Sequence, residues 1–242
     1  PDARTVAARP RVETEKRSLE RKVQVMKYRY FLLSGLLACW GHVAGSSGDH
    51  AIPQLKNGFL IVEAEAFEEQ TRDGIRKWRI IREGRQPEAG DPAKWEIALA
   101  SASTGAFVTA WPDTRVTHDD PLVPGENFSN QPGRIAVLHY PVEFDEPGRY
   151  YVWVRAYSTG TEDNGIHVGL NGEWPESGQR MQWCAGKNQW TWESRQRTRE
   201  NHCGEPGRIY LDIPTAGRHV IQFSMREDGF AFDQFLLMKT GG

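Results

Sequence analysis

The closing stretch of the chain, GRHVIQFSMREDGFAFDQFLLM over Gly217–Met238, most constrains what it can fold into. Residues Arg218–Met225 alternate with a period of two, which predicts a half-buried strand. A loop then turns the chain, and Phe232–Met238 predicts a second, returning strand. Asp233 has the parity of Phe235, so the pattern predicts a carboxylate that points toward the core. Such a group is costly to bury unless it meets a cation or several donors.

Similar runs occur upstream, and together they predict an all-β fold. Runs of strand length are separated by turns rich in glycine and proline, whereas no run after residue 45 has the 3.6-residue apolar period of a helix. This arrangement is typical of a β-sandwich or β-barrel. The strongest run is Arg149–Tyr157, in which we interpret Trp153 as a structural residue. The other predicted strands cover residues 59–67, 74–83, 106–108, 134–144, 166–170 and 208–213, with loops over 86–94 and 112–133.

The first 45 residues differ from the rest in composition. Residues 1–25 are polar and basic without a period, which indicates a disordered leader or a misassigned start. Residues 26–45 combine early basic residues, an apolar run and small residues near their end, which predicts a secretory signal peptide. The stretch LLAC ending at Cys39 also resembles a bacterial lipobox, so Cys39 is the candidate lipidation site. We expect a secreted, periplasmic or cell-surface protein, with membrane attachment only through that anchor.

Charge and cysteine content narrow the function classes. Residues 46–242 carry 21 Lys and Arg against 28 Asp and Glu, a formal net charge of −7. Nucleic-acid binding is not expected, because it requires a basic surface. Beyond Cys39, the chain holds Cys184 and Cys203, which in an exported domain most simply form a disulfide. A zinc site is the alternative, since His202 adjoins Cys203, but the spacing typical of zinc ligands is missing.

Four segments carry a resemblance to a known family. They are Val62–Phe67 (VEAEAF), Gly148–Arg155 (GRYYVWVR), Val168–Gly172 (VGLNG) and Gly217–Leu237. In this order they resemble carbohydrate-binding modules of the galactose-binding-like type, families 6 and 35 above all. The long insertion after residue 183 makes the chain look most similar to the C-terminal domain of family 115 glycoside hydrolases. The resemblance covers residues 55–240 and implies a single jelly-roll β-sandwich.

The resemblance also implies a structural calcium ion that ties the first strand to the last. The matching carboxylates are Glu63, Glu65 and Asp233. On one extended strand, Glu63 and Glu65 share a face about 7 Å apart, where two carboxylates repel each other unless a cation or donors intervene. Ca²⁺ prefers such oxygen ligands. The alternative is that Glu63 or Glu65 forms an ion pair with an arginine such as Arg155.

A saccharide site beside the loop before the last strand is a further implication of the resemblance. The matching loop supplies Arg226, Asp228 and Phe230, and it has an aspartate where family members often place an asparagine. Sugar rings in these modules stack on aromatic side chains, while polar groups bind the hydroxyls.

The insertion offers Trp183, Trp190 and Trp192 as stacking platforms. Trp190 and Trp192 share a face if the stretch is extended, and Arg195 follows on the opposite parity. A kink is therefore needed before tryptophan and arginine can hold an acidic sugar together, the ring on tryptophan and the anion on arginine. The alternative is that these tryptophans pack against the disulfide as a local core.

These features predict non-catalytic binding of a polysaccharide or oligosaccharide, with a catalytic protein as an expected partner. Surface attachment through a protein or cell-wall polymer is one alternative, and a glycan-degrading enzyme is another. Only Glu63 and Glu65 approach the carboxyl separation that a glycosidase needs. The sequence has no nucleophile elbow, HExxH motif or phosphate-binding loop.

Overall fold

A computed structural model describes residues 52–71, 73–88 and 90–239 of the chain. The chain separates into two units, residues 1–50 and 51–242, and the described residues all belong to the second. The predicted leader, the signal peptide over residues 26–45 and Cys39 lie outside the described residues. Among the helices that are described, none is long and apolar enough to cross a membrane.

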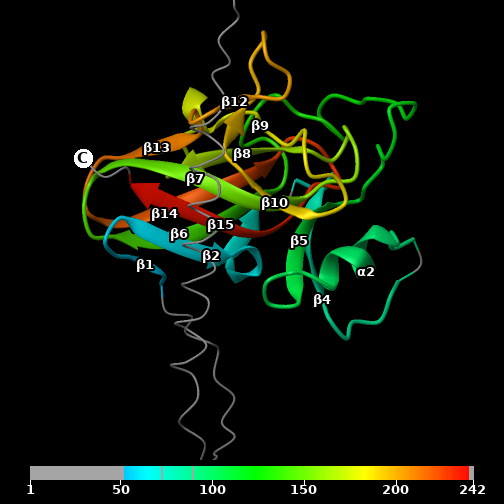
Figure 1. Cartoon of the computed structure of the whole chain (residues 1–242), viewed down its shortest axis with the longest axis horizontal. Helices are drawn as coiled ribbons and strands as arrows, with labels where there is room; N and C mark the ends of the chain where they lie inside the picture. The colour runs from blue at the N-terminus through cyan, green and yellow to red at the C-terminus, as the bar shows by residue number, and fades with distance from the viewer. Residues whose placement is uncertain (1–51, 72, 89, 240–242) are drawn as a thin grey trace, which may run out of the picture. The chain divides into compact units, whose positions relative to one another are not determined.

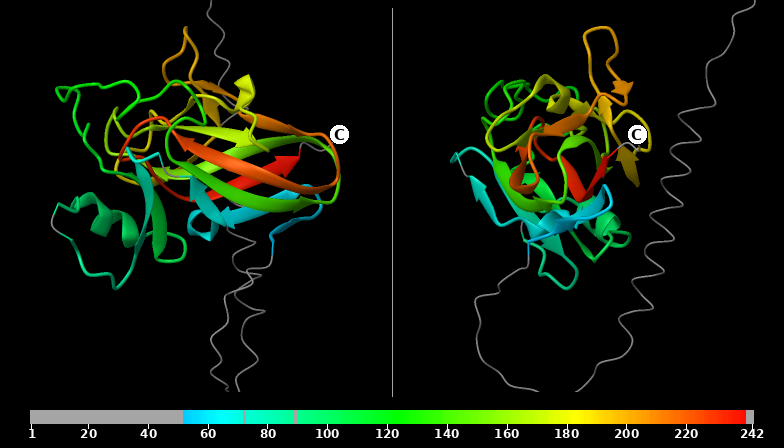
Figure 2. Two further views of the ribbon diagram at one scale, coloured as in Figure 1. Left: turned by 180° about the vertical axis from the view of Figure 1, so that it is seen from behind. Right: turned by 90° about the vertical axis from the view of Figure 1, so that its left-hand side faces the viewer.

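Two β-sheets stack face to face (Figures 1 and 2), as expected for a β-sandwich, and we name each after its central strand. The β14 sheet has the order β1 (Gln54–Leu55), β6 (Val137–Phe144), β14 (Gly217–Met225), β8 (Gly165–Leu170), β9 (Met181–Gln182), β11 (Arg195–Gln196) and β12 (Glu205–Pro206), with β3 (Glu69–Thr71) paired to β6. The β15 sheet has the order β10 (Trp190–Glu193), β7 (Gly148–Tyr157), β15 (Ala231–Lys239), β5 (Ala106–Trp111) and β4 (Lys77–Arg82), with β13 (Tyr210–Ile213) paired to β7 and β2 (Phe59–Glu63) paired to β15.

The two closing strands, β14 and β15, lie in different sheets. β14 pairs with β6 and β8, whereas β15 pairs with β2, β5 and β7. The expectation of a returning strand pair is therefore wrong, because loop 226–230 carries the chain across the sandwich. Each strand still buries the apolar face that the period of two predicts, and the two faces meet in the core between the sheets.

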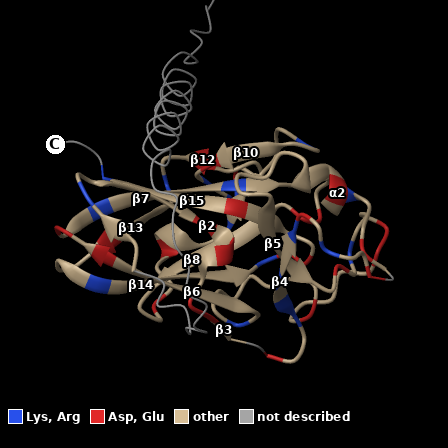
Figure 3. Ribbon diagram, turned by 90° about the horizontal axis from the view of Figure 1, so that it is seen from below, with Lys and Arg blue, Asp and Glu red and all other residues tan. Residues whose placement is uncertain are grey.

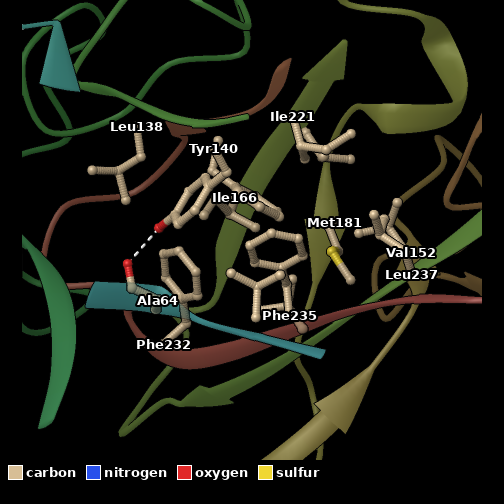
Figure 4. Packing of buried hydrophobic residues seen from close by; sticks show 14 of the residues in the cluster. Ala64, Leu138, Tyr140, Val152, Ile166, Met181, Ile221, Phe232, Phe235 and Leu237 are labelled. Atoms are coloured by element: carbon tan, nitrogen blue, oxygen red, sulfur yellow. Dashed lines mark hydrogen bonds between the residues drawn. The ribbon is translucent and has the colours of Figure 1, made fainter. Parts of the chain in front are cut away.

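That core is rich in aromatic side chains (Figure 4). Tyr140 contacts Phe235 and Phe223 edge-on, with ring centroids 4.9 and 5.9 Å apart. Its hydroxyl donates a 2.5 Å hydrogen bond to the carbonyl oxygen of Ala64, so the polar end of the ring is satisfied. Burial of each such side chain contributes roughly 1.5–3 kcal/mol, which makes this layer the main stabilising element of the fold.

A second apolar layer lies on the outer face of the β15 sheet, where helix α2 (Lys94–Leu99) covers β4 and β5 (Figure 1). Trp95, Ala98 and Leu99 of the helix pack with Phe107 and Tyr157 of the sheet. This helix contradicts the expectation of no helix in the domain. Its six residues are fewer than two turns, too few for a 3.6-residue period to stand out in the sequence.

The first and last strands pair as the resemblance implies. β2 runs antiparallel to β15, with Val62 opposite Phe235 and Glu63 opposite Gln234. β2 ends at Glu63, earlier than predicted, and the 3₁₀ turn η1 (Ala64–Ala66) follows; a second such turn, η2 (Glu176–Gly178), lies after β8. Glu65 therefore sits on a turn, and the prediction that Glu63 and Glu65 share one strand face is wrong.

Candidate functional site

The three predicted metal-binding carboxylates converge on one short loop. The backbone N–H of Ser103 donates to Asp233 Oδ2 over 2.9 Å, and the Ser103 hydroxyl donates to Glu63. The hydroxyl of the next residue, Thr104, donates to Glu65 Oε1 over 2.5 Å. We call Glu63, Glu65 and Asp233 the carboxylate cluster. The resemblance therefore identified three acidic residues that contact one loop, although they come from β2, η1 and β15.

A β-bulge sets the direction of Asp233. The register between β15 and β7 shifts between Phe232 and Gln234, so both Phe232 and Phe235 face the core with two residues between them. Asp233 instead contacts Arg155, which alternates with core residues of β7 and so lies on the outer face of the β15 sheet. The expectation that Asp233 points into the core is wrong, because parity counted from the sequence does not include a bulge.

Arg155 supplies a cation to the cluster. Its guanidinium pairs with Asp233, whose side chain is 0% exposed, and its Nη2 donates to the Ser101 carbonyl over 3.1 Å. The alternative to calcium placed this arginine on Glu63 or Glu65, whereas the structure pairs it with Asp233. On the other side, Gln234 Nε2 donates to Glu63 Oε1 over 2.6 Å.

The cluster offers oxygen donors of the kind that suits a hard cation. Glu65 Oε2 and the amide oxygen of Gln234 are buried and accept no hydrogen bond. Within residues 52–71, 73–88 and 90–239, however, no group of three or more His, Cys, Asp or Glu side chains is arranged to hold a metal ion. Calcium here would have to be held by two or fewer of these carboxylates together with amide or carbonyl oxygens, which Ca²⁺ accepts as ligands.

The predicted binding loop, residues 226–230, is buried. Asp228 is 0% exposed and receives hydrogen bonds from Arg76 and from the backbone and hydroxyl of Thr114, at 2.9, 2.8 and 2.7 Å. Arg226 pairs with Glu227. The expectation that Arg226 and Asp228 reach a ligand at the surface is therefore wrong. Their charges are compensated inside the protein, where they fasten the loop to the segment around Thr114.

Two predicted stacking residues belong to the core. Trp183 and Phe230 are each 0% exposed, and their ring centroids lie 5.1 Å apart. The indole N–H of Trp183 donates to the Thr191 carbonyl oxygen over 3.3 Å, so its polar atom is also satisfied internally. A ring without exposed surface cannot stack on a sugar, so the structure corrects both assignments to packing roles.

Trp190 and Trp192 lie side by side on the outer face of the β15 sheet, as their spacing predicts. They pair with Tyr157 and Arg155 of β7. Trp190 is partly exposed and is braced by Phe107 and Tyr157, each 5.5 Å away between ring centroids. Trp192 is 8% exposed.

Arg195 lies on β11, in the other sheet, because the chain crosses at Ser194. It pairs with Glu193 instead of lying beside the tryptophans. The kink that the sequence required is present, but it moves the arginine to the outer face of the β14 sheet.

Further aromatic side chains extend this surface beyond Trp192. Tyr151 and Trp153 alternate with core residues of β7, so they lie on its outer face, and Tyr210 of β13 pairs with Tyr151 at 5.9 Å between ring centroids. All three are partly exposed. We call the set of Tyr151, Trp153, Trp190, Trp192 and Tyr210 the aromatic face. Its residues belong to β7, β10 and β13, and Figure 3 shows few charged positions along these strands.

Apolar residues of the neighbouring strands lie on the same outer face, where Phe59, Ile61 and Met238 are partly exposed and Leu236 is not exposed. On β15, Leu236 pairs with Trp153 and Met238 pairs with Tyr151. On β2, Ile61 pairs with Leu236 and Phe59 pairs with Met238. Sequence reasoning missed this surface by interpreting Trp153 as structural. The available signal was the parity of Tyr151, Trp153 and Arg155, which is opposite to that of the valines in the same strand.

The loops at one end of the sandwich meet in a buried charge network. Lys94 Nζ lies 2.8 Å from Asp113 Oδ2 and 3.1 Å from Asp163 Oδ2. Burial acts to lower the pKa of Lys94, but the two carboxylates outweigh it and raise that pKa. Burial also raises the pKa of Asp113, against the attraction of Lys94, whereas Lys94 and the hydrogen bonds of Thr159 and Gly160 lower the pKa of Asp163 despite its burial. This network fixes the loops and leaves little free charge for a ligand.

Cys184 and Cys203 form the predicted disulfide, with their Cα atoms 5.3 Å apart. The bridge closes the segment that contains β10, so it constrains the strand that carries Trp190 and Trp192. Both cysteines are exposed, and neither contributes to a metal site.

Comparison with known proteins gives one curated relative. The chain is 56% identical over 188 residues to the uncharacterized protein P23 of Formosa agariphila, a match that covers 75% of this chain and 44% of that protein. The chain therefore spans less than half of its relative's length. No family model matches the chain.

Among solved structures, the chain is similar to a family 35 carbohydrate-binding module from Clostridium thermocellum, with 12% identity and a TM-score of 0.42 over 75% of this chain and 98% of that one. It is also similar to the C-terminal family 6 module of a marine laminarinase from Zobellia galactanivorans, with 14% identity and a TM-score of 0.39 over 75% and 99%. A family 35 module from Paenibacillus barcinonensis matches with 11% identity and a TM-score of 0.40 over 75% and 99%.

Proposed function

We propose that this chain binds a polysaccharide without cleaving it, and that the aromatic face is the binding surface. The observation that carries the proposal is the strand register of the β15 sheet, which places Tyr151, Trp153, Trp192 and Tyr210 on one outer face. Tyr151, Trp153, Trp190 and Tyr210 are partly exposed, and a group of such aromatic side chains on one sheet face indicates a binding surface.

The regular spacing of the aromatic residues on this surface supports a saccharide chain as its ligand. Sugar rings have apolar faces that stack on aromatic side chains, and strands space their same-face residues regularly along the sheet. At the edge of the face, the polar groups of Arg155 and Gln234 are already bonded to Asp233, Ser101 and Glu63, so the binding energy would come mainly from ring stacking. The four sequence segments that resemble families 6 and 35 support the same class of ligand. The closer likeness to family 115 enzymes and the export of the chain, with or without lipid on Cys39, stay predictions.

A binding role without catalysis is supported by the state of the nearby carboxylates. Glu63 and Asp233 lie next to the aromatic face, but Gln234, Ser103 and Arg155 already bind them. A glycosidase needs one carboxyl group free to donate a proton and a second free to act as nucleophile or base.

We also propose a structural calcium ion at the carboxylate cluster, supported by the buried acceptor oxygens of Glu65 and Gln234. In this role calcium would hold β2 against β15.

Affinity electrophoresis tests the function. The wild-type chain should be retarded in gels containing one of a set of neutral, uronic and sulfated polysaccharides, with a dissociation constant on the order of 0.01–1 mM. Trp153→Ala should weaken the retardation about tenfold, because a stacking surface is lost. Trp174→Ala is the matched control, since Trp174 lies against Gly169 on the outer face of the β14 sheet. Equal retardation of wild type and Trp153→Ala would reject the aromatic face as the site.

A protein-docking role is the second candidate function, and the length of the relative favours it. The match covers 44% of that protein, so more than half of its length lies outside this region. If the aromatic face docks another domain, no polysaccharide should retard the chain, and Trp153→Ala should change its association with the remainder of such a protein instead.

A further inference from the structure

Three arginines gather on the outer face of the β14 sheet, at the end that β9 and β11 form. Met181 and Gln196 pair across these strands, and the next residues outward, Arg180 and Arg197, are joined by a 2.8 Å hydrogen bond from Arg197 N to Arg180 O. Arg226 lies near both of them. Its pKa is lowered first by burial and further by the positive charges of Arg197 and Arg180.

Arg180 and Arg197 lie opposite each other on neighbouring strands, so their positive charges repel unless negative groups compensate them. Like charges directly opposite each other in a sheet are destabilising. Arg180 has a partner in Glu176, and Arg226 has one in Glu227. In the part of the chain that the structure describes, no carboxylate forms an ion pair with Arg197. Its Nη2 donates instead to the uncharged acceptor Nδ1 of His202 over 2.7 Å.

The position of Arg180 is fixed by its surroundings. Its backbone is in the left-handed region, with φ of 54°, which is strained for a residue with a side chain. Its N–H donates to His167 Nδ1 over 3.1 Å, and Nε2 of the same ring lies 3.0 Å from the Ser129 carbonyl oxygen. Burial lowers the pKa of His167 to about 3, so the ring stays neutral and keeps Nδ1 as an acceptor. The guanidinium of Arg180 also donates from Nε to the Arg197 carbonyl oxygen over 3.2 Å.

We propose that Arg180 and Arg197 bind an oxyanion substituent, a sulfate ester or a carboxylate, of an acidic saccharide. The proposal rests on the proposed function and specifies its substrate class. A planar guanidinium binds such groups through two parallel hydrogen bonds, and Arg197 has donors to offer because no carboxylate occupies it. Because Arg180 is already paired with Glu176, the oxyanion would mainly compensate the charge of Arg197. β10, which carries Trp190 and Trp192, runs through Ser194 into β11 of the other sheet, so the two proposed sites lie on different sheets and are joined by one chain segment.

The test compares dextran, dextran sulfate and polygalacturonate in affinity gels at one ionic strength, with inorganic sulfate as a separate probe in thermal melts against chloride. Arg197→Gln and the double variant R180Q/R197Q remove the site. Arg82→Gln, an exposed arginine of β4, is the control for net charge. We expect an acidic polymer to retard the wild-type chain more than dextran does. Arg197→Gln should bind the acidic polymer about tenfold more weakly than wild type, whereas Arg82→Gln should bind it as wild type does. Stabilisation by sulfate should also disappear in Arg197→Gln. The polymer arms decide between sulfate and carboxylate.

Three outcomes overturn the inference: no retention of wild type by either acidic polymer, an unchanged Arg197→Gln, or an equal loss in Arg82→Gln. The same gels keep the inference and the proposed function distinguishable. If Trp153→Ala abolishes retention and Arg197→Gln does not, the oxyanion site fails and the aromatic face stands. If Arg197→Gln abolishes retention and Trp153→Ala does not, the aromatic face fails and the oxyanion site stands.

Discussion

Arg155 on β7 and Asp233 on β15 form an ion pair on the outer face of the β15 sheet, at the bulge between Phe232 and Gln234. The Arg155 side chain is 18% exposed and that of Asp233 is not exposed at all. Arg155 contacts Asp233 of the carboxylate cluster and lies opposite Trp192 in the sheet, so it connects the cluster to the proposed binding surface.

Arg155→Met is expected to lower the free energy of unfolding by about 3 kcal/mol, because Asp233 then remains buried without this cation. Asp233→Asn added to Arg155→Met should recover part of the loss, since the uncompensated charge is removed as well. Urea titration of the three proteins measures the effect. Equal stability of wild type and Arg155→Met would show that the ion pair is not needed to hold Asp233.

Chelation addresses the proposed calcium. If an ion joins β2 to β15 at the carboxylate cluster, EGTA should lower the melting temperature and added Ca²⁺ should restore it, since a ligand that binds only the folded state stabilises it. Glu65→Gln should reduce the response to EGTA, because it weakens an oxygen ligand. An identical midpoint with and without EGTA in differential scanning calorimetry would remove calcium from the account and leave Arg155 as the cation of the cluster.

Reduction of the Cys184–Cys203 bridge should cost about 3 kcal/mol of stability in the chain-entropy description, given the sequence separation of 19. The loss should be accompanied by weaker polysaccharide retention, because the bridge closes the loop that contains β10. Denaturant unfolding with and without reductant measures the first effect, and gel retardation measures the second. A Cys184→Ser, Cys203→Ser variant serves as the control for effects of the reductant itself.

Because His167 is buried, the free energy of unfolding is expected to fall in acid. Its pKa is lowered to about 3 by burial, below its ordinary value of 6.5, so the unfolded chain binds this proton more tightly than the folded one. Stability from this residue is complete above pH 6.5 and is lost as the pH falls toward 3. Between pH 7 and 5 the loss is expected to be about 2 kcal/mol. His167→Gln, which keeps a donor and an acceptor, should show a smaller difference between unfolding titrations at these two pH values.

The sequence predicted much of the fold because its signals are local. The period of two identified β7, β14 and β15 to within one or two residues, and a polar turn separated each from the next strand. The two late cysteines predicted their bridge. The antiparallel pairing of β2 with β15 and the meeting of Glu63 with Asp233 came from the family resemblance, which records long-range pairing that a single strand pattern does not contain.

The candidate site depended on tertiary contacts that no local pattern records. Alternation shows which residues share a face, but it does not show whether that face is covered, so Trp183 and Phe230 were expected at the surface and lie in the core. The partly exposed rings of Tyr151 and Trp153 lie on a strand in which Trp153 was interpreted as structural.

The chain's own sequence thus determined the strands, which follow from spacing along the backbone, and the disulfide, which follows from the two late cysteines. Only the tertiary structure decided which sheet each strand joins, where the bulge turns Asp233 outward, and which aromatic rings reach solvent. Those properties depend on segments far apart in the sequence, and burial is set by how they pack against one another.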